Sequence, residues 1–261
     1  MFKSLPLFNV ETLQYPQIFP RVMKDSPAVQ KWNMDYLNSI CPHQKVSVSK
    51  YLPSHSAMNF IQSFSNTEFL SIKEVNCQMK NGLFENKAVE ECPRVIIENP
   101  ELNSDLIDLS RFTSSSLGPD ALTLWINGNN RVIDFHKDSK SAFLLQIYGK
   151  KVVRFVAPSF DDKMKIITKQ KIDALFKFLN HTKVAKSYGE ETVWSDVLAF
   201  NDNSNLIESI TGFEITLNPG DLLIMPKDWW HATKSFGVNI SVNCEVNQVG
   251  VRWDALRKAL E

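Results

Sequence analysis

The feature that most constrains the fold of this chain is a series of short strand-like runs in its second half. Each run is rich in β-branched, aromatic and other apolar residues, as strands usually are. Turn-forming residues separate the runs, with the sequence NGNN at residues 127–130 and a glycine at Gly149. Many short strands with turns at this spacing predict a β-sandwich or barrel. The first four runs cover residues 122–126, 131–136, 142–148 and 151–157.

The series of runs is interrupted at residues 159–211 and then resumes. Within the interruption, residues 169–183 carry apolar residues at helical spacing, which predicts a partly helical insert. Residues 218–221, Asn-Pro-Gly-Asp, form a turn signal between two of the later runs. We therefore expect one β-sandwich that is interrupted by this insert. The later runs cover residues 213–217, 222–226, 229–234 and 237–243.

Residues 1–120 have a mixed pattern, which predicts an α/β cap on the β core. Residues 26–40 place apolar side chains on one approximate helix face, and residues 45–52 alternate between apolar and polar as a strand does. Residues 56–64 predict a helix, and residues 99–112 a loop followed by a short helical piece. We expect a single domain over residues 1–261, with the cap at 1–120, a jelly-roll core at 121–247, the insert at 159–211 and a C-terminal helix at 248–261.

The charge balance argues against a dedicated nucleic-acid-binding domain. Lys and Arg together number 29, as do Asp and Glu, so the formal net charge is zero, whereas such domains are strongly basic. The four cysteines form no CxxC pair, which predicts free thiols in a reducing compartment. No stretch approaches the roughly 20 apolar residues of a membrane span, and the first residues lack a signal-peptide pattern. We therefore expect a soluble, intracellular protein, most simply a cytoplasmic one.

Residues 131–138, RVIDFHKD, contain the local half of a metal site. On a strand, side chains two residues apart share a face and lie about 6–7 Å apart. His136 and Asp138 therefore point together, and Lys137 points to the opposite face. Two histidines and one carboxylate form the facial triad of non-haem Fe(II) oxygenases, which leaves three coordination positions open.

A third ligand has to come from elsewhere, and His231 is the best placed of the five histidines. It follows an apolar strand, a proline and the pair Trp229 and Trp230, so it is well placed to enter a dry cavity. A second interpretation stays open at this point. An HxD sequence is common by chance, and a histidine after two tryptophans is often only packed.

Two further residues favour the metal site. Lys151 follows the glycine turn and begins the returning strand, where a buried lysine needs an anionic partner. The distal carboxylate of 2-oxoglutarate would provide one through a charge-assisted hydrogen bond. The amide of Asn243, on the strand after His231, is a second candidate contact for a cosubstrate. A solvent-exposed hairpin lysine and a simple strand-end asparagine are the alternatives.

Three segments together carry a family resemblance: residues 136–158, residues 218–233 and, more weakly, residues 20–37. They contain HKDSKSAFLLQIYGKKVVRFVAP, NPGDLLIMPKDWWHAT and PRVMKDSPAVQKWNMDYL. They resemble the JmjC-type hydroxylases of the cupin-8 kind, which include the asparaginyl hydroxylase acting on hypoxia-inducible factor and the tRNA wybutosine hydroxylase. The resemblance implies a double-stranded β-helix, the cupin jelly roll.

The resemblance also implies roles for particular residues. His136, Asp138 and His231 would bind the iron, and Lys151 would pair with the C5 carboxylate of 2-oxoglutarate. Asn243 would lie near the cosubstrate. The aromatic residues Trp229, Trp230, Phe143 and Phe135 would wall the cavity or belong to the ordinary core.

Three positions depart from the family pattern. Ile133 stands where the group usually has a threonine whose hydroxyl helps to hold the cosubstrate. Ala142 replaces a frequent asparagine, and Glu245 replaces a frequent tryptophan. The candidates for replacing the lost hydroxyl are Thr123, Ser141 and Tyr148.

The function implied is oxygenation with Fe(II), 2-oxoglutarate and O₂, in which 2-oxoglutarate is decarboxylated to succinate. The resemblance favours hydroxylation of a protein or peptide side chain. RNA or small-molecule hydroxylation are alternatives, N-methyl-lysine demethylation ranks lower, and a metal-binding cupin without oxygenase activity belongs to a different class. The insert is expected to shape the substrate entrance, and the oligomeric state stays open.

Overall fold

The computed structural model describes residues 2–4, 11–51, 67–89, 92–114, 121–178, 192–200 and 210–260. The helix expected at residues 56–64 lies outside the described residues. Within the described part of the chain, no helix is long and apolar enough to cross a membrane.

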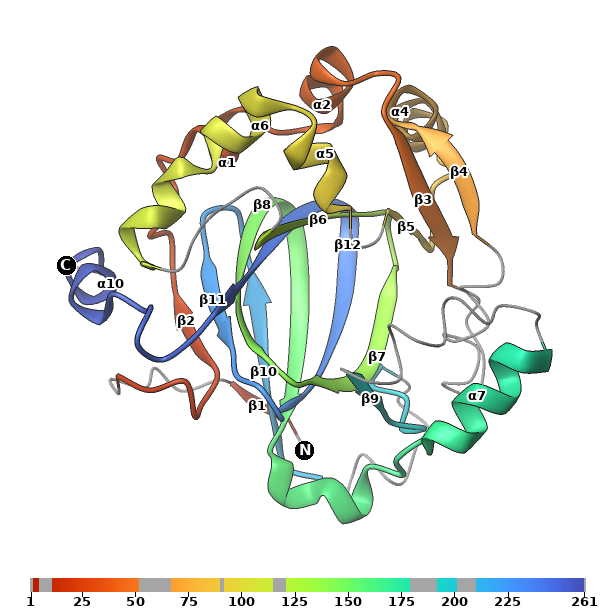
Figure 1. Ribbon diagram of the computed structural model, residues 1–261, viewed down its shortest axis with the longest axis vertical. Coiled ribbons are helices and arrows are strands. Elements are labelled where there is room, and N and C mark those ends of the chain that lie inside the picture. The colour runs from red at the N-terminus through yellow and green to blue at the C-terminus, as the bar shows by residue number, and fades with distance from the viewer. Residues whose placement is uncertain are drawn as a thin grey trace.

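Two sheets that share their long strands form the core of the molecule (Figure 1). One sheet has the order β6–β12–β8–β11, and the other has the order β7–β12–β8–β10. All of these pairs are antiparallel. This arrangement confirms the expected cupin jelly roll. The strands are β6 (Leu122–Asn127), β7 (Val132–Asp138), β8 (Ser141–Val156), β10 (Gly212–Leu217), β11 (Leu222–Met225) and β12 (Trp230–Val246).

Strands β8 and β12 each belong to both sheets, because each bends at a corner. The sequence predicts two strands on either side of Gly149, but the structure has one strand that continues through this residue. The first half of β8 pairs with β11 and the second half with β10. Gly149 has a φ of +77° and lies against the backbone of Val238, which is at the corresponding corner of β12. A glycine therefore allows the two corners to approach each other closely.

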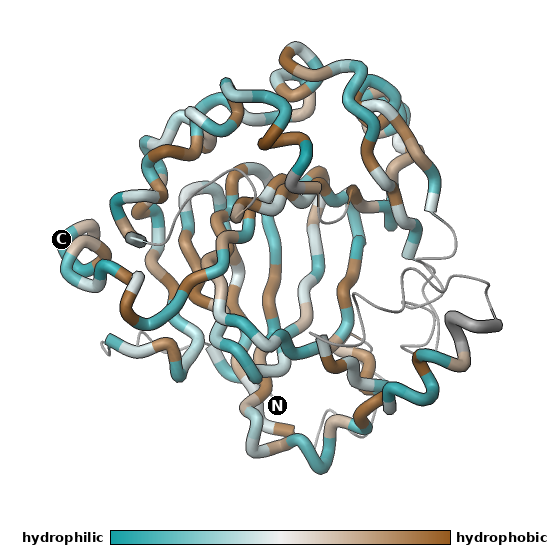
Figure 2. Tube along the Cα trace, in the orientation of Figure 1, coloured by the Kyte–Doolittle hydropathy of each residue, from teal (hydrophilic) through white to brown (hydrophobic). Residues whose placement is uncertain are grey.

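Alternation along each strand separates an inner face from an outer one. Leu122, Leu124 and Ile126 of β6 face outward into a large core shared with the cap, so Thr123 and Trp125 face the barrel interior. Figure 2 shows this alternation of hydrophobic and hydrophilic segments along the central strands. The interior is therefore more polar on β6 than the outer face.

The cap covers the outer face of the first sheet, and its helices arch over one side of the barrel (Figure 1). Strands β3, β4 and β5 extend this sheet beyond β6, and β2 adds to its other edge at β11. The predicted α/β cap is therefore present. Its elements are β2 (Gln17–Phe19), α1 (Pro27–Lys31), α2 (Met34–Ile40), β3 (Lys45–Lys50), β4 (Glu68–Ser71), α4 (Ile72–Lys80), β5 (Lys87–Val89), α5 (Pro93–Ile97), α6 (Pro100–Asp105) and the 3₁₀ helix η2 (Ile107–Arg111).

The helix predicted at residues 26–40 is in fact two helices, α1 and α2. The break lies at Trp32 and Asn33, both of which have extended backbone conformations. The Asn33 side chain accepts a hydrogen bond from the backbone N–H of Tyr36, which starts a new helix there. A local capping interaction therefore overrides the continuous apolar pattern.

The insert leaves the barrel after β8 and returns at β10. It contains the 3₁₀ helix η4 (Pro158–Lys163), α7 (Lys169–Phe178) and the short strand β9 (Thr192–Trp194), which pairs with β7. Outside the insert, β1 (Phe2–Ser4) pairs with β10, and α10 (Trp253–Lys258) is the expected C-terminal helix. The insert thus contributes a strand next to the end of β7 that carries His136 and Asp138.

Candidate metal centre

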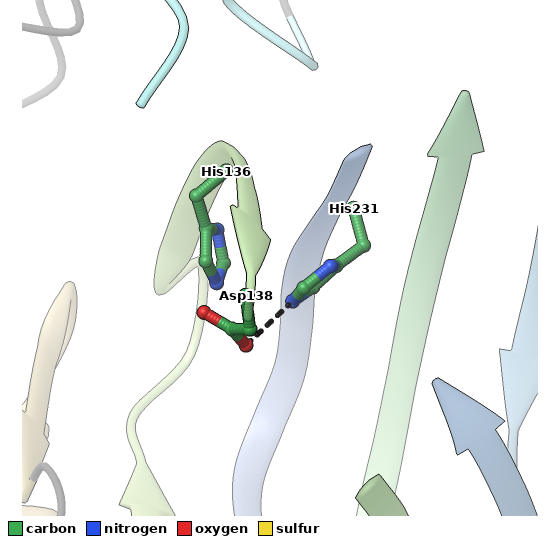
Figure 3. Close-up of side chains that lie close together, drawn as sticks. All are labelled: His136, Asp138 and His231. Atoms are coloured by element: carbon green, nitrogen blue, oxygen red, sulfur yellow. Dashed lines mark ion pairs between the residues drawn. The ribbon is translucent and has the colours of Figure 1, made fainter. Parts of the chain in front are cut away.

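The structure brings His136, Asp138 and His231 together at one end of the barrel (Figure 3). One potential ligand atom from each residue lies within 4.8 Å of the others. His136 and His231 are direct neighbours across the β7–β12 ladder. The distance from His231 Nε2 to Asp138 Oδ2 is 3.5 Å. No other group of three or more such residues that could hold a metal is found among the described residues.

Both histidines present the same ring nitrogen to this centre. His136 Nδ1 lies 2.9 Å from the carbonyl oxygen of Asp134, and His231 Nδ1 lies 3.0 Å from that of Trp229. A carbonyl oxygen only accepts hydrogen bonds, so each Nδ1 carries the proton and each Nε2 keeps its lone pair. Backbone carbonyls that orient histidines in this way are typical of metal sites.

The protonation state of His136 also suits metal binding. Burial and the adjacent His231 lower the pKa of His136 to about 4, against an opposing effect of Asp138. His136 is therefore neutral at pH 7, and a neutral imidazole is the form that binds a metal.

The insert supports two of these three side chains. The Trp194 ring stacks on the His136 ring with centroids 4.6 Å apart. The Thr192 hydroxyl donates a hydrogen bond of 3.1 Å to Asp138 Oδ1. Neither residue was predicted from the sequence, because the strand that carries them has only three residues. A short run containing a β-branched residue and a tryptophan was the available signal.

Lys151 lies in the barrel interior, four residues along β8 from Phe155, which pairs with His231. Its side chain is buried, and Nζ donates a hydrogen bond of 2.7 Å to Ser241 Oγ. Burial lowers the pKa of this amine to about 7. Within the described residues it forms no ion pair, so a buried cation lacks an anion here.

Asn243 and Thr123 are direct neighbours across the β12–β6 ladder, on the face that lines the interior. Asn243 Oδ1 and the Nε1 of the nearby Trp125 are buried, and neither has a hydrogen-bond partner among the described residues. Buried polar atoms are normally satisfied. Together with Lys151, these atoms fit a small polar ligand with an anionic end, such as a dicarboxylate.

The position of Ile133 depends on an irregularity in β7. The pairing of β7 with β12 shifts by one residue, so that His231 pairs with His136 but Thr233 pairs with Ile133. Residues that pair directly share a face, so Ile133 faces the interior as His136 does. The residue that departs from the family pattern therefore lines the barrel.

The three candidate replacement hydroxyls lie in different places. Thr123 faces the interior, at the end near the metal centre. Ser141 lies on the outer face, where its oxygen accepts a hydrogen bond from the backbone N–H of Lys227. Tyr148 lies near the Gly149 corner with 42% of its surface exposed. Ser141 and Tyr148 are thus outside the interior.

The other two departures are neighbours. Glu245 pairs directly with Ala142 across the β12–β8 ladder. Glu245 also forms an exposed ion pair with Lys140, at 3.0 Å. Ala142 and Glu245, which are far apart in the sequence, therefore lie side by side at the end of the barrel.

The aromatic residues expected around the cavity mostly pack elsewhere. Phe143 belongs to the core beneath the cap, and Phe135 and Trp230 belong to a core under the insert. Trp229 belongs to the inner cluster, together with Phe155. Alternation along their strands explains the outward direction of Phe135 on β7, Phe143 on β8 and Trp230 on β12.

Comparisons with known proteins identify the family. The sequence profile of the cupin-like domain matches residues 8–244. The chain belongs to this family. Its similarity to JmjC-domain proteins confirms the resemblance inferred from the motifs.

Three relatives illustrate the similarity. The chain is 25% identical over 235 residues to JmjC domain-containing protein A of Dictyostelium discoideum, covering 84% of this chain and 83% of that protein. It is 24% identical over 244 residues to the human bifunctional peptidase and (3S)-lysyl hydroxylase JMJD7, covering 87% and 76%. It is 21% identical over 235 residues to lysine-specific demethylase JMJ30 of Arabidopsis thaliana, covering 87% of this chain and 49% of that protein. The chain thus spans about half the length of several relatives that it matches.

Proposed function

We propose that this chain is an Fe(II)- and 2-oxoglutarate-dependent oxygenase that hydroxylates a protein or peptide side chain. The observation that carries the proposal is the convergence of two histidines and one aspartate, with both Nδ1 atoms held by backbone carbonyls. This set of donors suits Fe(II) and leaves part of the coordination sphere open. When bound, the iron and 2-oxoglutarate supply the O₂-dependent oxidation and the decarboxylation to succinate.

The chain's own residues have the task of binding and orienting. His136, Asp138 and His231 would hold the iron. Lys151 would bind the distal carboxylate of 2-oxoglutarate, because it is a buried amine without an anionic partner among the described residues. Asn243 would lie beside the cosubstrate, since its Oδ1 is buried and has no hydrogen-bond partner in the described part of the chain.

The substrate class rests on similarity. One relative is named a lysyl hydroxylase and two are named lysine-specific demethylases, so proteins are the most consistent substrate class. Hydroxylation of RNA or of a small molecule is the alternative, and its test is a substrate screen.

The first test is binding of Fe(II) and 2-oxoglutarate without oxygen. We expect a visible metal-to-ligand charge-transfer absorption, followed by slow succinate release when air is admitted. Asp138→Ala, which removes the only anionic member of the triad, should abolish both signals. Asp254→Ala is the control, because Asp254 is an exposed carboxylate on α10.

The outcomes separate two classes of protein. Metal binding without absorption or succinate would reject the oxygenase and favour a cupin that only binds metal. Full activity of Asp138→Ala would reject the assignment of the ligands.

A further inference from the structure

The hydroxyl that Ile133 lacks has a counterpart directly opposite to it. Thr233 of β12 pairs with Ile133 of β7 across the ladder, so the two side chains lie side by side on the interior face. One position of this pair is apolar and the other carries a hydroxyl. The pair therefore still offers a hydroxyl to the interior, from the neighbouring strand.

Thr233 also lies between the metal centre and Lys151. On β12, Thr233 is two residues from His231 and two residues from Ser235, which pairs with Lys151. Side chains two residues apart on one strand share a face. Thr233 and Lys151 are thus diagonal neighbours on the interior face, within reach of a common ligand.

The hydroxyl of Thr233 is available, whereas its neighbours are engaged. Ser241 Oγ accepts the hydrogen bond from Lys151 Nζ, and Ser235 Oγ accepts one from Asn127 Nδ2 at 3.0 Å. Within the part of the chain that the structure describes, the Thr233 hydroxyl makes no hydrogen bond, although the residue is only 8% exposed. A hydroxyl in this position can donate a hydrogen bond to a bound carboxylate.

We propose that Thr233 replaces the missing hydroxyl of position 133 and, with Lys151, holds the distal carboxylate of 2-oxoglutarate. The inference rests on the proposed function for the identity of this ligand. Thr233 is a binding residue here, and Ser241 is a positioning residue, because it acts through Lys151.

The test is the affinity of the Fe(II)-loaded protein for 2-oxoglutarate, measured by calorimetry without oxygen. Thr233→Val, which keeps the shape and removes the hydroxyl, should weaken binding by about 10-fold, as expected for a lost charge-assisted hydrogen bond. Fe(II) affinity should not change. Binding of pyruvate, a 2-oxo acid without a distal carboxylate, should not change either.

Two further variants make the test specific. Thr123→Val removes the hydroxyl of the competing candidate, which faces the interior near the metal centre, and should leave the affinity unchanged. The transposed pair Ile133→Thr with Thr233→Ile should restore most of the affinity, because it returns the hydroxyl to the neighbouring strand.

The outcomes distinguish this inference from the proposed function. If the unaltered protein binds no 2-oxoglutarate, both fall. If it binds 2-oxoglutarate and Thr233→Val binds it equally well, only the role of Thr233 is overturned. Weaker binding by Thr123→Val alone would transfer the role to Thr123.

Discussion

At the scale of single residues, Asp138 receives a hydrogen bond from outside the barrel core. Its side chain is 42% exposed, so packing alone does not fix the position of the carboxylate. Thr192, on the insert, donates the hydrogen bond to Oδ1, and Oδ2 faces His231. Groups that hold a metal ligand in this way affect the metal affinity.

Thr192→Val should therefore lower the affinity for Fe(II) by about 10-fold, because the carboxylate loses the hydrogen bond that orients it. Equilibrium dialysis against a chelator measures this change. Thr216→Val, a threonine of β10, is the control and should bind Fe(II) like the unaltered protein. An unchanged affinity in Thr192→Val would show that Asp138 is oriented without the insert.

Lys151 predicts a dependence of cosubstrate binding on pH. Burial lowers the pKa of its amine from 10.5 to about 7, so the charged form that binds a carboxylate is lost above neutral pH. The dissociation constant for 2-oxoglutarate should be constant below pH 7 and then rise by up to about 10-fold per pH unit. Calorimetry between pH 6 and pH 9 tests this expectation.

The matched variant for this prediction is Lys151→Arg. A guanidinium stays charged over this range, so the variant should lose the pH dependence even if its affinity is lower overall. The same slope in both proteins would mean that a group other than Lys151 titrates.

The sequence pattern was informative for residues whose position follows from local spacing. His136 and Asp138 share a face because they are two residues apart, and Lys151 follows the turn at Gly149. Thr192 and Trp194 could not be predicted in the same way. They approach the site through pairing of β9 with β7, over a separation that no local pattern encodes.

At the scale of elements, the strands were predictable and their register was not. Short apolar and β-branched runs between turn signals located β6, β7 and β11 closely. The shifted pairing in β7 is different, since strict alternation puts Ile133 and His136 on opposite faces and the shift puts them on the same face. Such irregularities depend on the partner strand.

The corner of β8 makes a prediction about stability. A Cβ atom added at Gly149 would lie 2.1 Å from the carbonyl oxygen of Val238, and the backbone there has a φ of +77°. Gly149→Ala should therefore destabilise the protein by about 3 kcal/mol or more, since both the clash and the left-handed conformation oppose the side chain. Urea unfolding measures the loss.

Gly237 provides the matched control at the other corner. Its φ is +69°, but a Cβ atom there would meet nothing within 4 Å. Gly237→Ala should lower the free energy of unfolding by only about 1 kcal/mol, because the left-handed backbone conformation is the only source of strain there. Equal losses of stability in the two variants would mean that the backbone near Gly149 moves to make room for the added Cβ atom at little cost.

At the scale of the whole molecule, the cap and the barrel share one hydrophobic core. Leu37 of α2 and Val242 of β12 are both fully buried and belong to the same cluster. The cap is also held by Asp105, which accepts hydrogen bonds from the Trp32 indole and the Tyr36 hydroxyl. The sequence indicated helices here but not what they would cover, because a helical apolar face does not specify its partner.

This shared core predicts that the cap and the barrel unfold as one unit. Leu37→Ala leaves a cavity in the core and should lower the free energy of unfolding by about 2–5 kcal/mol. If the two parts are cooperative, hydrogen exchange should accelerate by the same factor in the protected amides of α2 and of β12, because both exchange through global unfolding. Ile107→Ala, at a residue that is 63% exposed, is the control. It should change the opening free energy of the α2 amides and of the β12 amides by no more than about 0.5 kcal/mol. Faster exchange in α2 with unchanged protection in β12 would instead divide the chain into two independently stable parts, despite their common core.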